Sequence, residues 1–170
     1  MRASIVIPCY NTERFIADAI QSALSQTYPI AEIVVVNDGS TDGSLEIIKS
    51  FSGITVVSQA NGGLSAARNA GLPHVTGDYV VFLDADDRLL PDAVELHLAA
   101  FEKNPGAPVV YGSAHLIDAD GCAIGDSLQP PAHFGWREVL FGRTPSPSQA
   151  MKRPPLVSPT RCPAPRSPAS

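Results

Sequence analysis

Three carboxylates follow directly after an apolar run in residues 78–91, which read DYVVFLDADDRLLP. In an extended backbone Asp84 and Asp86 point to the same side, so their like charges repel, and Asp87 adds a third charge. A divalent cation relieves this repulsion, and Mg²⁺ or Mn²⁺ commonly takes one or two carboxylates together with substrate phosphates. We therefore hypothesise a metal–diphosphate site at the carboxyl end of a central strand. An acidic loop that caps the following helix is the alternative.

The size and composition of the chain favour one domain that does not bind nucleic acid. Of its 170 residues, 44% are hydrophobic, which is enough for a sizeable core. With 12 basic and 17 acidic residues the net charge is −5, and the sequence has no basic run of the kind that binds phosphate backbones. No segment reaches the roughly 20 apolar residues that span a bilayer, and no signal peptide is evident. We therefore expect a cytoplasmic location.

Strand-like and helix-like segments alternate along the chain. Short, continuously apolar runs predict buried strands at residues 3–8, 32–36, 54–58 and 79–83. Apolar residues recur at helical spacing from 12 to about 26, at 45–51, at 64–70 and from 93 to about 104, and Asn11 or Thr12 is expected to cap the first helix. A further strand at 109–113 and a hairpin at 116–124 are also predicted. This alternation is typical of an α/β fold with a doubly wound, mostly parallel sheet.

Polar residues follow each of the first four predicted strands. These clusters are residues 10–11, 38–39, 61–63 and 84–87. Because the carboxyl ends of parallel strands meet at one edge of the sheet, all four clusters are expected to line the same ligand site. Taken singly, most have simpler explanations: Tyr10 could only pack, Asp38 could only form a turn, and Arg68 could form a surface ion pair. Their convergence favours the functional interpretation.

Four motifs resemble those of one enzyme family. They are SIVIPCYN at residues 4–11, VVNDGSTD at 35–42, the segment 61–71, and FLDADD at 82–87. Their order and spacing resemble the nucleotide-sugar-binding half of the inverting family 2 glycosyltransferases over about residues 3–143. The resemblance implies a GT-A type fold that binds a sugar nucleotide, usually UDP-linked, together with Mg²⁺ or Mn²⁺. It also implies transfer of the sugar, with inversion, to a hydroxyl of a glycan, lipid-linked or protein acceptor.

The resemblance assigns a role to each of seven residues. Pro8 and Tyr10 would shape the nucleoside pocket, and Asp38 would accept a hydrogen bond from the base. Asn61 and Arg68 would contact the nucleotide, Asp84 would lie beside the ribose and sugar, and Asp86 would hold the metal. These roles suit the side chains, because a carboxylate can select a base that carries an N–H and a guanidinium matches phosphate. Family members often work at the inner face of the membrane, so a peripheral membrane association is consistent with the resemblance.

The carboxyl-terminal part of the sequence departs from the family pattern. An inverting transferase needs a general base, which in the family is an acidic residue well downstream. Here the last acidic residue is Glu138, and residues 144–170 contain eight prolines and no acidic residue. We expect a donor-binding domain at residues 1–143 with an incomplete acceptor half, and a disordered tail at 144–170. The catalytic base is then missing, and the alternative to an active enzyme is a truncated nucleotide-sugar-binding remnant without transfer activity.

Other enzyme classes fit the motifs less well. A dinucleotide-dependent oxidoreductase or a nucleotidyltransferase would show a glycine-rich phosphate loop after the first strand, where this chain has Pro8 and Tyr10. A glycosidase needs two carboxylates that face each other across a sugar, whereas Asp84 and Asp86 are neighbours on one edge. The sequence therefore favours nucleotide-sugar chemistry.

Overall fold

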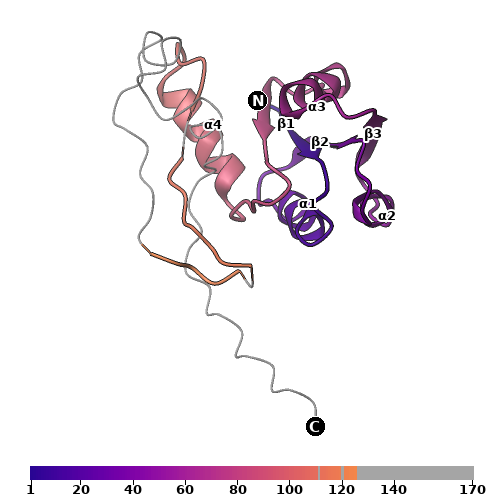
Figure 1. Cartoon of the computed structure of the whole chain (residues 1–170). Helices are drawn as coiled ribbons and strands as arrows, with labels where there is room; N and C mark the ends of the chain where they lie inside the picture. The colour runs from indigo at the N-terminus through magenta and orange to yellow at the C-terminus, as the bar shows by residue number, and fades with distance from the viewer. Residues whose placement is uncertain (111, 120, 126–170) are drawn as a thin grey trace, which may run out of the picture.

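The computed structural model describes residues 1–110, 112–119 and 121–125. The predicted tail at 144–170, and the end of the predicted donor-binding domain, lie outside these described residues. The described chain is built around a parallel sheet with strand order β3-β2-β1-β4 (Figure 1). The strands are β1 (Ala3–Cys9), β2 (Ile30–Asp38), β3 (Thr55–Gln59) and β4 (Tyr79–Phe82). The predicted α/β fold with a mostly parallel sheet is confirmed.

The two central strands are apolar because both of their faces are covered. All seven residues of β1 and the last six of β2 are buried. In register, Val6 of β1 lies between Val34 of β2 and Phe82 of β4. Successive side chains alternate between two hydrophobic clusters, one containing Ile5 and the other containing Val6. The continuous apolar runs in the sequence therefore reflect burial on both sides of the sheet.

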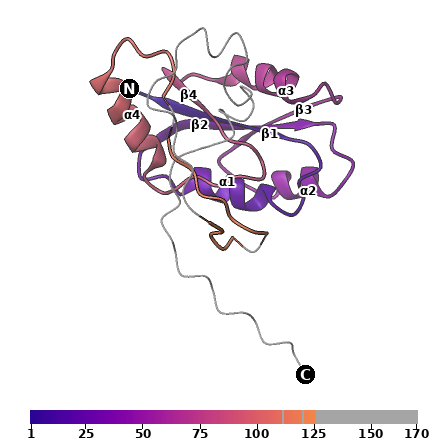
Figure 2. The ribbon, with the colours of Figure 1, turned by 60° about the vertical axis from the view of Figure 1, so that its left-hand side comes forward.

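Helices cover both faces of the sheet. In Figure 2, α3 (Leu64–Gly71) lies on one face, and α1 (Ile16–Leu24) and α2 (Ser44–Lys49) lie on the other. A short 3₁₀ turn (Leu72–His74) follows α3, and α4 (Ala93–Lys103) follows the carboxylate segment after β4. Helix α3 packs closely on the sheet because Gly71 has no side chain: a Cβ there would lie 2.5 Å from Cγ1 of Val6. Because α3 follows β3 in a parallel sheet, the first turn of the helix lies at the carboxyl edge.

Two predicted local features are wrong, and one is confirmed. Helix α1 begins at Ile16, and no side chain of the described residues caps it, because Oδ1 of Asn11 accepts a hydrogen bond from the amide of Thr41 instead. The predicted strand at 109–113 is absent from the described residues of that range, none of which pairs in a strand. The hairpin is present, with an antiparallel bridge between Ile117 and Ala123. The sequence pattern thus located the turn of the hairpin correctly. It predicted one strand, at 109–113, that the described residues do not form.

A carboxylate joins three segments at the amino-terminal edge of the sheet, opposite the predicted site. Glu32 of β2 accepts hydrogen bonds from the hydroxyl of Ser4 and from the amide and hydroxyl of Thr76, which precedes β4. Burial raises the pKa of the Glu32 carboxyl, but the hydrogen bonds outweigh burial, so the pKa lies below its ordinary value. Glu32 is therefore held as an ion that connects β1, β2 and the start of β4.

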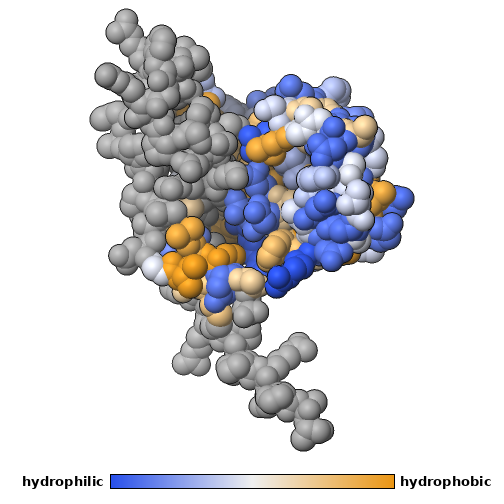
Figure 3. Space-filling view, in the orientation of Figure 1, coloured by the Kyte–Doolittle hydropathy of each residue, from blue (hydrophilic) through white to orange (hydrophobic). Residues whose placement is uncertain are grey.

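The surface of the described chain is mixed, with one apolar concentration. Figure 3 shows a mostly hydrophilic surface over the helices that flank the sheet, and an orange patch beside the grey atoms at lower left. That part of the chain contains the hairpin, where Leu116 and Ile124 are about half exposed. Within the described ranges, no helix has the length and hydropathy required to cross a membrane.

Candidate functional site

A cavity of about 250 Å³ lies at the carboxyl ends of β1, β2 and β4. This edge is where ligands bind in open parallel sheets. Its walls come from β1 and the loop after it, the end of β2, the start of α3 and the segment after β4. The lining residues are Pro8, Cys9, Tyr10, Thr12, Asp38, Asn61, Gly63, Leu64, Ala67, Asp84, Ala85 and Asp86. The four polar clusters of the sequence therefore do contribute to one site.

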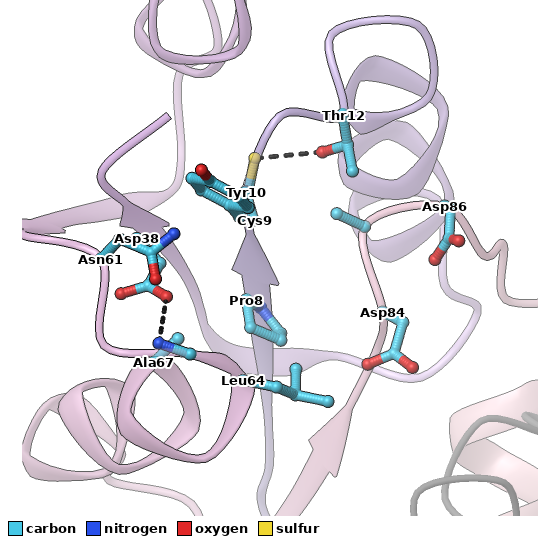
Figure 4. A pocket seen from close by; sticks show the side chains of 12 residues that line it. Pro8, Cys9, Tyr10, Thr12, Asp38, Asn61, Leu64, Ala67, Asp84 and Asp86 are labelled. Atoms are coloured by element: carbon cyan, nitrogen blue, oxygen red, sulfur yellow. Dashed lines mark hydrogen bonds between the residues drawn. The ribbon is translucent and has the colours of Figure 1, made fainter. Parts of the chain in front are cut away.

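The cavity has two polar sides with an apolar centre. Figure 4 shows Asp38 and Asn61 on one side and Asp84 and Asp86 on the other, with Pro8 between them. Tyr10 immediately follows β1, the strand that contains Pro8. Its side chain is 48% exposed, so the ring is accessible to a ligand. Six of the seven predicted site residues line this cavity, and Arg68 is the exception. The first side offers the carboxylate of Asp38 and the amide of Asn61. The second side offers the carboxylates of Asp84 and Asp86.

Asp38 is a buried carboxylate that holds the opposing loop in place. Its Oδ1 accepts hydrogen bonds from Nε2 of Gln59 at 2.7 Å and from the amide of Gly62 at 2.9 Å. Its Oδ2 accepts one from the amide of Gly63 at 2.8 Å, which leaves that oxygen able to accept another. Burial raises the pKa of Asp38, but these hydrogen bonds lower it by more. Asp38 thus stays ionised, fixes the loop 59–63, and retains an acceptor for a ligand N–H.

Gly39, next to Asp38, allows the loops after β2 and β3 to approach. Its φ of 72° is in the left-handed region that favours glycine. A Cβ at this position would lie 2.7 Å from the backbone nitrogen of Asn61. Asn61 is thereby brought against the end of β2, which places it on the same side of the cavity as Asp38. In the Asp38–Gly39 pair, the aspartate therefore bonds the loop 59–63, and the glycine leaves room for that loop to approach.

Arg68 lies behind the cavity wall, where it pairs with Asp84. Its Nη2 donates a hydrogen bond to Oδ1 of Asp84 at 2.8 Å, and its guanidinium carbon lies 5.6 Å from the centre of the Phe82 ring. Oδ2 of Asp84 is buried and has no hydrogen-bond partner among the described residues. A buried carboxylate oxygen without a partner is costly, so a ligand donor or cation at this position would be favourable. Asp84 is oriented by Arg68 on one oxygen and presents the other.

Asp86 differs from Asp84 in being exposed at the rim of the cavity. Among the described residues, no group of three or more His, Cys, Asp or Glu side chains is arranged to hold a metal ion. Mg²⁺ and Mn²⁺ do not require such a group when substrate phosphates complete the coordination. The exposed carboxylate of Asp86 and the unpartnered oxygen of Asp84 are hard oxygen ligands, so the residues present fit a divalent cation bound together with a diphosphate.

The family follows from comparison with known proteins. Residues 4–134 match the family described as glycosyl transferase family 2. The chain belongs to this family. It is 39% identical over 132 residues to the chondroitin synthase of Pasteurella multocida, covering 75% of this chain and 14% of that protein. A hyaluronan synthase of Pasteurella multocida matches with the same identity and coverage. The chain thus spans about a seventh of the length of these two family 2 relatives.

Solved structures of glycosyltransferases share the fold. S. aureus TarS in complex with UDP superimposes with a TM-score of 0.57 at 26% identity, covering 69% of this chain and 42% of that one. Glucosyl-3-phosphoglycerate synthase of Mycobacterium tuberculosis, in complex with Mn²⁺, UDP and glucosyl-3-phosphoglycerate, gives 0.51 at 28% identity, covering 59% and 39%. The predicted GT-A type architecture is confirmed by these neighbours.

Several lining residues of this family 2 cavity were not singled out from the sequence. Leu64 and Ala67 line it from the first turn of α3, where their spacing of three places them on one face. Cys9 and Thr12 line it from the first strand and loop, with Sγ and Oγ1 3.1 Å apart. All four lie inside the motifs or directly beside one, and that position is their only sequence signal. Their side-chain types alone do not indicate contact with a nucleotide.

Proposed function

We propose that this family 2 chain binds a nucleoside diphosphate sugar, UDP-linked, and transfers the sugar with inversion to an acceptor hydroxyl, assisted by a divalent metal. The observation that supports the proposal most is the two-sided cavity. It places Asp38 and Asn61 opposite Asp84 and Asp86, at the sheet edge where such ligands bind. UDP in the TarS complex is consistent with this donor class.

The side of the cavity with Asp38 is suited to the nucleoside. The spare acceptor position on Asp38 Oδ2 matches the N–H of a pyrimidine base, and a base without that N–H would leave this position unfilled. Tyr10 and Pro8 supply flat apolar surface for the base, and Asn61 supplies an amide for the nucleotide. Asp38 and these neighbours would therefore determine which nucleotide binds.

The side with Asp84 and Asp86 is suited to the ribose and diphosphate. Asp84 presents its unpartnered oxygen to a ligand hydroxyl, held in place by Arg68. Asp86 would hold Mg²⁺ or Mn²⁺, as in the family pattern; Mn²⁺ accompanies UDP in the Mycobacterium tuberculosis neighbour. When bound, such an ion supplies Lewis-acid stabilisation of the leaving diphosphate. In this arrangement Asp86 orients the diphosphate through the metal, and Asp84 orients the ribose.

The three lining carboxylates favour donor binding as a second, narrower candidate function. Asp38 is engaged by the loop 59–63, Asp84 is paired with Arg68, and Asp86 is assigned to the metal. None of these three is left over as a general base for the acceptor hydroxyl. Binding of a nucleotide sugar without transfer is therefore supported by the described residues alone, and transfer to a glycan, lipid-linked or protein acceptor requires a base from elsewhere.

Calorimetric titration with UDP, with and without Mn²⁺, tests the proposal. Wild-type protein should bind UDP more tightly when Mn²⁺ is present, and Asp86→Asn should abolish that gain. Asp92→Asn is the matched control, because it removes the same charge from an exposed residue outside the cavity. Absence of UDP binding by folded wild-type protein would refute the proposal. Transfer from radiolabelled UDP-sugars to candidate acceptors then separates the enzyme from the binding protein.

A further inference from the structure

Two loops at the carboxyl edge are joined by reciprocal hydrogen bonds. One loop follows β1 and the other follows β2, and side chains of each accept hydrogen bonds from backbone amides of the other. Asn11 N donates to Ser40 Oγ (3.1 Å), Thr41 N to Asn11 Oδ1 (2.8 Å), Thr12 N to Ser44 Oγ (3.0 Å), Glu13 N to Asp42 Oδ2 (3.1 Å), and Gly43 N to Glu13 Oε2 (2.8 Å). We call these five bonds the loop clamp.

The backbone conformation in the clamp depends on Asn11. Its φ is 52°, in the left-handed region that asparagine tolerates better than most residues. This conformation allows the backbone amide and the side-chain Oδ1 of Asn11 to bond the other loop simultaneously. Asn11 is itself exposed and does not line the cavity. Its side chain is used between the loops and is not available to a ligand in the cavity.

The clamp connects two walls of the cavity on the side that contains Asp38, which is the side proposed for the nucleoside. Tyr10 immediately precedes Asn11, and Asp38 immediately precedes the Gly39–Gly43 turn, so the clamped residues flank both. Asp42 bridges the turn, with Oδ1 accepting from the amide of Ser44 at 3.0 Å. The other side of the cavity is held differently, by the Arg68–Asp84 pair and by the bond from Leu83 N to Val6 O. The clamp thus acts on one half of the site.

We propose that Asn11 and Glu13 are positioning residues for nucleoside binding, which they promote by holding Tyr10 and Asp38 in their ligand-binding arrangement before the ligand arrives. The inference rests on the proposed function, because it assumes that a nucleoside occupies this side of the cavity. Without the clamp, ligand binding must also order the two loops, and that ordering weakens affinity. The effect is confined to ligands that contain the nucleoside.

Two pairs of variants separate the hydrogen bonds from other effects. Asn11→Gly keeps the left-handed backbone accessible but removes the acceptor for Thr41, whereas Asn11→Asp retains an acceptor oxygen. Glu13→Ala removes the acceptor for Gly43, whereas Glu13→Gln retains one. Both residues are exposed, so these variants should remain folded. The conservative member of each pair is the rescue control.

The variants are titrated with UDP, uridine and inorganic pyrophosphate, each with Mn²⁺. Asn11→Gly and Glu13→Ala should weaken binding of UDP and uridine by about tenfold, the size expected for one lost hydrogen bond. Pyrophosphate affinity should not change, and Asn11→Asp and Glu13→Gln should bind UDP like the wild type. Amide hydrogen exchange, measured without ligand, should show protection at Thr41 in the wild type that Asn11→Gly loses.

Three results would overturn the inference. The first is an unchanged uridine affinity in both Asn11→Gly and Glu13→Ala. The second is an equal loss of uridine and pyrophosphate affinity, which would indicate a general effect on the fold. The third is unaltered exchange at Thr41 in Asn11→Gly, which would show that the clamp does not order the loop. Failure of wild-type protein to bind UDP is a separate result, which refutes the proposed function itself.

Discussion

Nη2 of Arg68 lies 2.8 Å from Oδ1 of Asp84, and each side chain is about nine-tenths buried. The pair connects α3 to the segment that follows β4, at the carboxyl edge of the sheet. The Phe82 ring against the guanidinium shields it further. A residue that the family resemblance assigned to nucleotide contact thus positions a carboxylate that lines the cavity.

Replacing Arg68 with methionine should destabilise the fold and weaken nucleotide binding. Asp84 would remain as a buried charge without its partner, and breaking such a pair typically costs about 3 kcal/mol or more. Urea unfolding measures the loss, and UDP titration measures the effect on the site. Arg68→Lys, which keeps the charge but not the planar fork, should lose less. A loss for Arg68→Met no larger than for Arg68→Lys would contradict the importance of the pair.

Asp38→Asn should also be destabilising. The amide group of asparagine offers one acceptor oxygen where the carboxylate has two, so the amide of either Gly62 or Gly63 loses its acceptor. A hydrogen bond to a charged acceptor contributes about 1.5–3 kcal/mol, a loss that urea unfolding resolves. The matched control is Asp18→Asn, which removes an exposed partner of Arg88 and should change stability by less than about 1 kcal/mol. Equal effects of the two substitutions would rule out a structural role for Asp38.

The stability of the chain should fall in acid partly through Glu32. Because the folded-state pKa of Glu32 is lowered, its contribution is fully present above the ordinary pKa of a glutamate in the unfolded chain and is lost as pH falls through the folded-state value. Glu32→Gln cannot gain this proton, so its unfolding free energy should vary less with pH below about 4.5. Urea unfolding at a series of pH values compares the two proteins. Parallel pH profiles would contradict the assignment.

Gly39→Ala should cost more stability than an alanine at another glycine of similar conformation. Gly39 and Gly53 have φ values of 72° and 78°, so alanine is strained at both. At Gly53 the nearest atom to the new Cβ would be a side-chain carbon of Leu24 at 3.8 Å, an ordinary contact, whereas at Gly39 the Cβ would meet the backbone of Asn61. The difference should be about 1–3 kcal/mol, the usual cost of overpacking. A Gly39→Ala variant as stable as Gly53→Ala would show that the loop can move aside.

The sheet, and the edge at which the cavity lies, could be predicted because both follow from the pattern of apolar and polar residues along the sequence. Continuous apolar runs such as Val34–Val36 require burial on both faces, and that requirement already implies a parallel sheet with helices on each side. The polar residues after each strand then fall at a common edge without further information. For this reason Asp38 and Asp84 could be placed in one cavity from the sequence alone.

The partners of the polar side chains could not be predicted from local pattern. Asn11 has the chemistry to cap its own helix, but it bonds Thr41, 30 residues away, because the fold brings that loop closer. Arg68 could have pointed toward a ligand or toward Asp84, and sequence spacing does not distinguish these outcomes. The predicted strand near residue 109 lacked any local sign that it would find no partner in the described chain.

Among the described residues, the side chains that line the cavity all belong to residues 8–86, a contiguous stretch whose segments pack against the same sheet. We therefore expect such a stretch to be transferable to another chain as one unit. A chimera joined after Lys103, at the end of α4, would keep the cavity walls while exchanging everything that follows. This junction separates the cavity walls from every later residue, and it offers a practical point for engineering.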